Sequence, residues 1–98
     1  MRAENSDGVF TIFLDSEIDA QNATAIKGQI DGLLPSRGEA PLVFDAKELT
    51  YISSAGLRLL LSTQKELGQK ISVINVSPDI IEIFQMAGFQ QLMNIKGA

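Results

Sequence analysis

The fold is decided by the segment Thr50-Tyr51-Ile52-Ser53-Ser54-Ala55-Gly56-Leu57-Arg58-Leu59-Leu60-Leu61, in which two adjacent serines precede a strongly apolar run. Serine is a preferred residue at a helix N-terminus, because its hydroxyl oxygen accepts a hydrogen bond from a backbone N–H that has no partner within the helix. The same N–H groups and the helix dipole would stabilise a phosphate placed there. The segment therefore predicts a helix start, and spacing alone leaves its serines open to a structural or a regulatory role.

The helix is predicted from about Ser54 to Leu67, followed by Gly68 as a residue that can end it in a left-handed conformation. At about 100° per residue, the face expected to pack against the core consists of Leu57, Leu60, Leu61, Gln64 and Leu67. Leu59 falls on the opposite side with Ala55, Ser62 and Glu66. The spacing thus predicts an exposed Leu59, which is either an ordinary surface residue or a contact for a partner protein.

Apolar runs on both sides of this helix predict buried strands at Val9–Leu14, Leu42–Phe44 and Ile71–Val76. A short final strand is expected at Leu92–Ile95. Residues before the Ser6-Asp7-Gly8 turn should pair back on the first strand as an antiparallel edge. The other predicted helices begin at the caps Asn22 and Ser77-Pro78, and they end before Pro35 and at Gly88. Strands that alternate with helices predict an α/β fold with a mixed, mostly parallel sheet and helices packed against it.

The composition describes one ordinary globular domain over residues 1–98. Apolar residues make up 45% of the chain, and the 98 residues suffice for one core but not for two domains. The net charge of -4 disfavours nucleic acid or an anionic membrane surface as a partner. The N-terminus lacks the apolar run of a secretion signal, and no run approaches membrane-spanning length. We therefore expect a cytoplasmic protein with no membrane insertion.

The chemistry of the sequence argues against an enzyme. The chain has no cysteine and no histidine, so thiolate chemistry, the usual metal sites and the commonest general base are missing. Gly56 stands without the second glycine and the lysine of a phosphate-binding loop, and no cofactor is expected. The serine segment also lacks the glycine that precedes a nucleophile by two residues.

Charged residues near the serines allow two further interpretations. The loops carry the carboxylates Asp15, Glu17, Asp19, Asp45 and Glu48, which either form a Mg²⁺ site or, as is commoner, are solvated separately. Arg58 lies in the first turn of the serine helix, where the dipole disfavours a cation. It could pair with a carboxylate or hold a phosphate on the adjacent serine.

The chain resembles the STAS domain family, which is shared by sulphate transporters and bacterial anti-sigma factor antagonists. The resemblance spans almost the whole chain and rests on the element order and on three patterns, namely Glu17-Ile18-Asp19, Val43-Phe44-Asp45 with its exit to Leu49, and Ile52-Ser53-Ser54-Ala55-Gly56-Leu57. In that family the last pattern is typically Asp-Ser-Ser/Thr-Gly-Leu, and a partner kinase phosphorylates the serine after the aspartate. The residue that matches this acceptor is Ser54. Ser53 replaces the family aspartate, Ala55 replaces the second hydroxyl residue, and Ser16 replaces a glycine.

The resemblance implies an anti-sigma factor antagonist that sequesters an anti-sigma factor serine kinase and is released when Ser54 is phosphorylated. A serine phosphatase would then be a further partner. The surface implied to contact the kinase comprises Asp19, Ser53, Ala55, Gly56, Arg58 and Leu59. The presence of Ser53 in place of aspartate favours an alternative of the same fold, a non-phosphorylated adaptor subunit of a lipid transporter or signalling scaffold. The oligomeric state is left open by the sequence.

Overall fold

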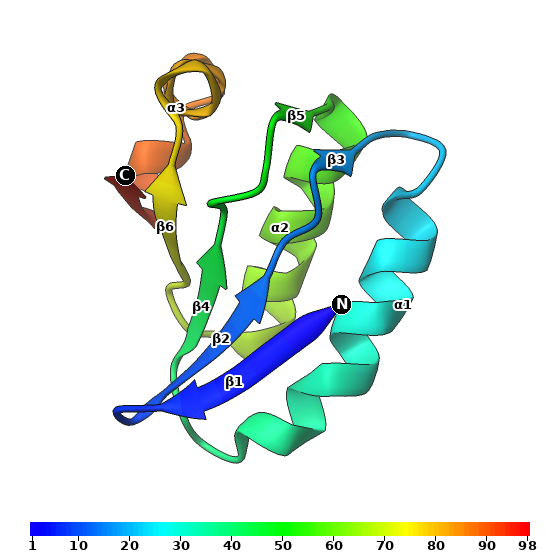
Figure 1. The fold of residues 1–98 in the computed structure, drawn as a ribbon, viewed down its shortest axis with the longest axis vertical. Coiled ribbons are helices and arrows are strands. Elements are labelled where there is room, and N and C mark those ends of the chain that lie inside the picture. Colours follow the sequence, from blue (N-terminus) through cyan, green and yellow to red (C-terminus); the bar gives the residue numbers. More distant parts are fainter.

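Three parallel strands form the centre of the main sheet in the computed structural model, which describes residues 1–98. They are β2 (Val9–Phe13), β4 (Leu42–Asp45) and β6 (Ser72–Val76). Strand β1 (Arg2–Ser6) lies antiparallel to β2 at one edge, and β7 (Asn94–Gly97) lies parallel to β6 at the other. The resulting order β1-β2-β4-β6-β7 (Figure 1) confirms the predicted α/β fold with its antiparallel edge strand.

The turn between β1 and β2 accounts for that antiparallel edge. Asp7 and Gly8 have positive φ values of 53° and 80°, and a two-residue turn of this conformation matches the twist of the strands that it joins. Ser6 pairs with Val9, and Arg2 pairs with Phe13 at the far end of the hairpin. The guanidinium carbon of Arg2 lies 3.8 Å from the centre of the Phe13 ring. The predicted Asp-Gly hairpin is therefore confirmed.

Three α-helices and two short 3-10 helices connect the strands, and they are α1 (Ala23–Leu33), η1 (Leu34–Arg37), α2 (Ser54–Leu67), α3 (Pro78–Met86) and η2 (Phe89–Gln91). Helices α1 and α2 lie side by side against the sheet, whereas α3 lies near β7 at the C-terminal edge (Figure 1). None of these helices combines the length and the apolarity that are needed to cross a membrane. Residues 50–61 lead into α2 and include its first turns.

The predicted helix ends follow from local capping. Ser77 caps α3, since its Oγ accepts a hydrogen bond from the backbone N–H of Ile80 at 3.4 Å, and Pro78 occupies the first helical position. Gly68 and Gly88 adopt left-handed conformations, with φ values of 67° and 75°, just beyond α2 and α3. Asn22 precedes α1 but makes no side-chain cap bond to it.

Two predicted boundaries are wrong. The last strand begins at Asn94 and not at Leu92, because the carbonyl of Leu92 accepts a hydrogen bond from Gln64 Nε2 at 2.9 Å and Met93 is buried. Gln64 Oε1 also accepts from the Ile71 N–H at 2.8 Å, so this predicted core residue is instead a polar link between α2 and two later segments. The loop that was expected to begin at Pro35 starts as the 3-10 helix η1.

Two very short strands were not predicted. Strands β3 (Glu17–Ile18) and β5 (Tyr51–Ile52) pair in parallel and form a separate small sheet beside the start of α2 (Figure 1). The Ser53 N–H extends this pairing by donating to the Ile18 carbonyl at 2.9 Å. A pair of two-residue strands carries no measurable hydrophobic alternation, so the sequence pattern contained no signal for it.

The buried face of α2 differs from the predicted one. The helix buries Gly56, Leu59, Leu60 and Thr63, whereas Leu57, Leu61 and Leu67 are only partly buried against the core. Leu59 is 5% exposed, so the prediction that it faces solvent is wrong. These four buried residues are spaced i, i+3, i+4 and i+7, so they form one continuous face, and α1 packs along the side that carries Leu59. The buried face is therefore rotated toward Leu59 from the face that helical spacing predicted.

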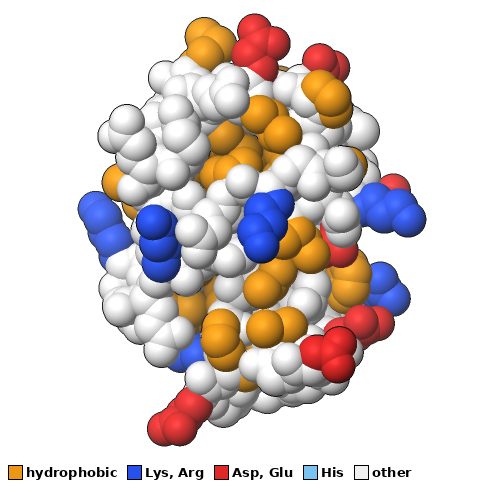
Figure 2. Space-filling view, turned by 90° about the vertical axis from the view of Figure 1, so that its left-hand side faces the viewer, with side chains coloured by type: hydrophobic (Ala, Val, Ile, Leu, Met, Phe, Trp, Pro, Cys, Tyr) orange, Lys and Arg blue, Asp and Glu red, His pale blue; other side chains and the backbone are white.

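One continuous core joins the helices to the sheet. Phe44 and Phe84 are its largest fully buried side chains, and the Phe84 ring stacks on Phe89 with 5.5 Å between the ring centres. Figure 2 shows the side of the molecule on which α3 and β7 lie, where apolar side chains appear in several patches between polar atoms, beside several Lys and Arg side chains. Exposed large apolar residues include Met86 at the end of α3 and Leu92 before β7.

Lys27 joins α1 to α2. Its Nζ lies 2.6 Å from Asp31 Oδ1 on its own helix and 3.0 Å from Glu66 Oε1 on α2. Partial burial acts to lower the pKa of Lys27, but the hydrogen bonds to Asp31 and Glu66 outweigh it and raise the pKa above the ordinary value of 10.5.

A pH titration of unfolding tests this link. Because the folded state favours charged Lys27, the stability that the link contributes is complete below about pH 10.5 and is lost as the pH rises through the folded-state pKa. We expect the free energy of unfolding, measured with urea, to fall less over this alkaline range in Lys27→Met than in the unaltered chain. Equal alkaline losses in both proteins would contradict the assignment.

Candidate functional site

The two serines at the start of α2 have different roles in the structure. Ser53 has an extended backbone, and its Oγ accepts a hydrogen bond from the Gly56 N–H at 3.3 Å, so it is the N-cap of the helix. Ser54 is the first helical residue and is exposed. The hydrogen bonds at this junction engage the hydroxyl of Ser53 and not that of Ser54. The structure therefore leaves Ser54 available for chemistry while Ser53 holds the helix end.

Gly56 fixes where the helix end lies. It is buried, and a Cβ built on it would lie 2.6 Å from Ile52 Cγ1, 2.9 Å from Ile18 Cγ2 and 3.1 Å from the Ile18 carbonyl oxygen. Side chains do not approach so closely, so α2 reaches the β3 and β5 pair only with glycine at this position. Gly56 thus positions both serines, and its own atoms lie beneath the surface.

Asp19 organises the loop that leads into α1. Its Oδ1 accepts hydrogen bonds from the N–H groups of Gln21 and Asn22 at 2.8 and 3.0 Å. In turn, Asn22 Oδ1 accepts a hydrogen bond from the Asp19 N–H at 2.9 Å, and Asn22 Nδ2 donates one to the Glu17 carbonyl at 3.0 Å. Because Glu17 belongs to β3, this network ties the start of α1 to the small sheet beside the serines. Asp19 is partly exposed, so it also remains in reach of a partner.

A surface hollow of about 470 Å³ surrounds Ser54. We call the part formed by Tyr51, Ser53, Ser54, Ala55 and Arg58 the serine surface. Tyr51 is 50% exposed, which is unusual for a large aromatic side chain in a folded domain. Tyr51 was not among the predicted site residues, because a two-residue strand gives no alternation from which its outward direction could be predicted.

Arg58 is an unpaired cation beside Ser54. The ion pairs of the structure engage Arg2 and Lys27, and none involves Arg58, which is exposed. Residues four apart on a helix lie on the same side, so Arg58 is one turn from Ser54. Its guanidinium can therefore reach either a phosphate on Ser54 or a carboxylate of a partner.

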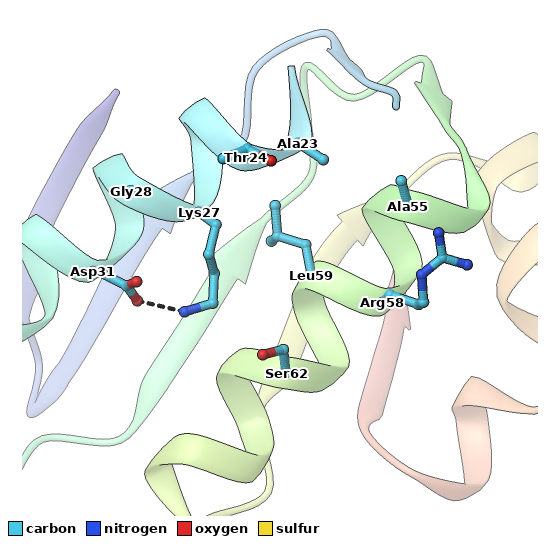
Figure 3. A pocket seen from close by; sticks show the side chains of 9 residues that line it. All are labelled: Ala23, Thr24, Lys27, Gly28, Asp31, Ala55, Arg58, Leu59 and Ser62. Carbon is cyan, nitrogen blue, oxygen red and sulfur yellow. Dashed lines mark hydrogen bonds and ion pairs between the residues drawn. The ribbon is translucent and has the colours of Figure 1, made fainter. Parts of the chain in front are cut away.

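Two residues of the predicted interface, Gly56 and Leu59, are buried. Leu59 points toward α1 (Figure 3), and its burial removes the argument that it is presented to a partner from the solvent face of α2. Ala55 is partly buried and Arg58 is exposed on the outer side of the same helix. The predicted residues that reach the surface around Ser54 are thus Ser53, Ala55 and Arg58, with Asp19 nearby in the loop before α1.

The loop carboxylates do not assemble into a metal site. No group of three or more acidic side chains is placed to hold an ion. Asp45 is almost fully buried at the end of β4, where it accepts from the Lys47 N–H at 2.9 Å and from Asn75 Nδ2 at 3.0 Å. Asn75 has a φ of 57° at an irregularity of β6, so Asp45 stabilises the ends of two strands. It does not contribute to the hollow around Ser54.

Comparison with known proteins places the chain in a family. The STAS domain family matches residues 1–97. BtrV of Bordetella bronchiseptica is 29% identical over 92 residues, which cover 91% of this chain and 78% of BtrV. The anti-sigma F factor antagonist of Paenibacillus polymyxa is 27% identical over 95 residues, which cover 94% of this chain and 81% of that protein.

Solved structures share the fold at lower identity. A Thermotoga maritima structure superposes with a TM-score of 0.83 at 13% identity, over 99% of this chain and 86% of that one. The Bacillus cell fate determinant SpoIIAA in its phosphorylated form superposes with a TM-score of 0.65 at 21% identity, over 96% of this chain and 88% of that one. These likenesses and the match along nearly the whole sequence agree with the resemblance of the serine segment, and the chain belongs to the STAS domain family.

Proposed function

We propose that this domain is an anti-sigma factor antagonist. It binds an anti-sigma factor that is also a serine kinase through the serine surface, and phosphorylation of Ser54 ends the complex. The relatives support the first part, since one of them is named an anti-sigma F factor antagonist. The phosphorylated form of SpoIIAA, which shares the fold, supports the second part. A pathway of this kind operates in the cytoplasm, where we place the domain.

One observation supports the proposal: the residue that caps α2 and the exposed serine beside it are different residues. Ser53 uses its hydroxyl to hold the Gly56 N–H, whereas Ser54 is exposed with its hydroxyl uncommitted. A kinase can therefore modify Ser54 without removing the cap of α2. Modification of Ser53 would instead attach the phosphoryl group to the oxygen that accepts the cap hydrogen bond. The fold thus offers one serine for phosphorylation and uses the other to keep it in place.

A phosphate on Ser54 changes the charge of the surface without unfolding the domain. It adds about -1.5 to -2 charges at neutral pH. The N-terminus of α2 favours an anion, and Arg58 lies one turn away and is not committed to another carboxylate. Within the domain the phosphate is therefore stabilised. A partner that binds the unmodified surface meets a new anion and a neutralised Arg58, and both effects weaken binding.

The site assignment is tested by phosphorylation in a purified system. The cognate anti-sigma factor kinase and ATP should add one phosphate to the unaltered domain, which intact mass spectrometry and peptide mapping would locate on Ser54. Ser54→Ala should take up none. Ser53→Ala is the matched control and should still be modified on Ser54, although α2 loses its cap and about 1 kcal/mol of stability. Phosphate on any other residue would overturn the assignment, and a serine phosphatase should restore the unmodified mass.

A non-phosphorylated adaptor of a lipid transporter or signalling scaffold is the alternative function. It is favoured by one observation, which is that Ser53 stands where phosphorylated members of the family carry aspartate. Affinity capture with the purified domain separates the two. Recovery of a transporter ATPase without a kinase would support the adaptor, whereas recovery of a serine kinase that modifies Ser54 would support the switch.

A further inference from the structure

A groove runs between the outer surfaces of α1 and α2, next to the serine surface. Its volume is about 510 Å³, and it is lined by Lys27 and Gly28 of α1 and by Leu59 of α2, which points toward α1 (Figure 3). Arg58 borders the groove from the outer side of α2. Three of the nine residues that line the groove are hydrophobic, namely Ala23, Ala55 and Leu59, and Leu59 is 5% exposed. Ala55 and Arg58 border both this groove and the hollow around Ser54, so the two depressions adjoin each other.

Gly28 keeps the groove open. A Cβ built on Gly28 would meet no atom within 4 Å, so neither close packing nor backbone conformation requires glycine there. Glycine inside a helix is nevertheless less stable than alanine or leucine. Gly32 has the same open surroundings one turn further along α1, but it does not line the groove. Neither glycine is required by packing within the domain, and the difference between them is that Gly28 lines the groove whereas Gly32 does not.

The charges at the groove indicate the chemistry of its occupant. Lys27 is held by Asp31 and Glu66 at 2.6 and 3.0 Å, so its charge is already balanced within the domain. Arg58, which borders the groove from α2, has no such partner. The groove thus combines a small apolar patch with one cation that has no ion-pair partner within the domain. A large apolar side chain beside a carboxylate would complement both.

We propose that the groove receives a segment of the anti-sigma factor that inserts a large apolar side chain over Leu59, next to Gly28, and pairs a carboxylate with Arg58. This proposal rests on the proposed function, and it adds the groove to the serine surface as a second region that contacts the anti-sigma factor. Arg58 then has two alternative partners, a carboxylate of the anti-sigma factor in the complex and the phosphate of Ser54 after modification. Phosphorylation would withdraw Arg58 from the groove as well as adding charge at the serine surface.

Paired glycine substitutions test the groove. Titration calorimetry with the purified kinase that modifies Ser54 should show at least about a 10-fold loss of affinity for Gly28→Leu, because the new side chain occupies the space of the inserted one. Gly32→Leu should bind within about 2-fold of the unaltered domain, since it changes the same helix outside the groove. Both variants should unfold at the same or a higher urea concentration, because leucine favours helix over glycine.

A second measurement separates groove binding from the switch. In amide NMR spectra of the domain, addition of the kinase without ATP should shift the signals of Gly28 and Leu59 and leave that of Gly32 unchanged. Ser54→Ala should give the same pattern. Unaltered binding by Gly28→Leu, or shifts confined to the serine surface, would show that the anti-sigma factor does not bind in the groove, and would leave the proposed function intact. If no anti-sigma factor kinase binds the unaltered domain, the proposed function fails, and this occupant is rejected with it.

Discussion

Phosphorylation of Ser54 should lower the affinity for the anti-sigma factor by at least about 100-fold, which corresponds to about 2.7 kcal/mol of binding free energy. The reason is electrostatic. Close to two negative charges appear at the exposed start of α2, and like charges brought together at an interface cost several kcal/mol. The phosphate also occupies Arg58, which otherwise has no ion-pair partner. Titration calorimetry with phosphorylated and unmodified domain measures the difference directly.

A charge series at residue 54 provides the control. Ser54→Ala removes the hydroxyl without adding charge and should bind about as well as the unaltered domain, whereas Ser54→Glu adds one negative charge and should fall between the two. The losses should shrink as salt is added, because exposed charges are screened over about 10 Å at 0.1 M ionic strength. If phosphorylated domain bound as tightly as Ser54→Ala, Ser54 would not be the switch.

Gly56→Ala should destabilise the domain by about 1–3 kcal/mol, which is the usual range for forcing an extra carbon into a packed interior. The added carbon would lie 2.6 Å from Ile52 Cγ1 and 3.1 Å from the Ile18 carbonyl oxygen, so either α2 or the small sheet must move. Alanine is otherwise the better helix former by up to about 1 kcal/mol, so steric conflict must exceed this gain. Urea unfolding followed by circular dichroism gives the difference.

Gly32→Ala is the matched control for this change. It is also a helical glycine, but it has no neighbour within 4 Å of the added carbon and should stabilise the domain by about 0.5–1 kcal/mol. Opposite signs for the two alanine variants would show that Gly56 is retained for the contact between α2 and the β3 and β5 pair. A Gly56→Ala variant as stable as the unaltered domain would contradict the packing described above. Because Gly56 also positions the serines, the same variant should bind the anti-sigma factor more weakly.

The sequence predicted those features of the site that depend on local chemistry. The start of α2 follows from a serine cap, and its end follows from Gly68 in the left-handed conformation. Both signals act over three or four residues, so a single sequence contains them completely. The separation of Ser53 as cap from Ser54 as first helical residue was predictable for the same reason.

Features that depend on distant segments were not predictable from the same pattern. Leu59 was expected at the surface because a helical wheel does not contain α1, which packs along that side of α2. The parallel pair of β3 and β5 joins residues far apart in the chain through two residues on each side, too few for a periodic signal. The importance of Gly56 also depends on that pair, since its closest neighbours are Ile18 and Ile52.

The central claim is that one surface at the start of α2 displaces a sigma factor from its anti-sigma factor until Ser54 is phosphorylated. The most direct test follows the fluorescence anisotropy of a labelled sigma factor bound to the purified anti-sigma factor. Addition of unmodified domain should release the sigma factor and lower the anisotropy. The same amount of domain phosphorylated on Ser54 should leave the anisotropy unchanged. Equal release by both forms, or release by neither, would contradict the account.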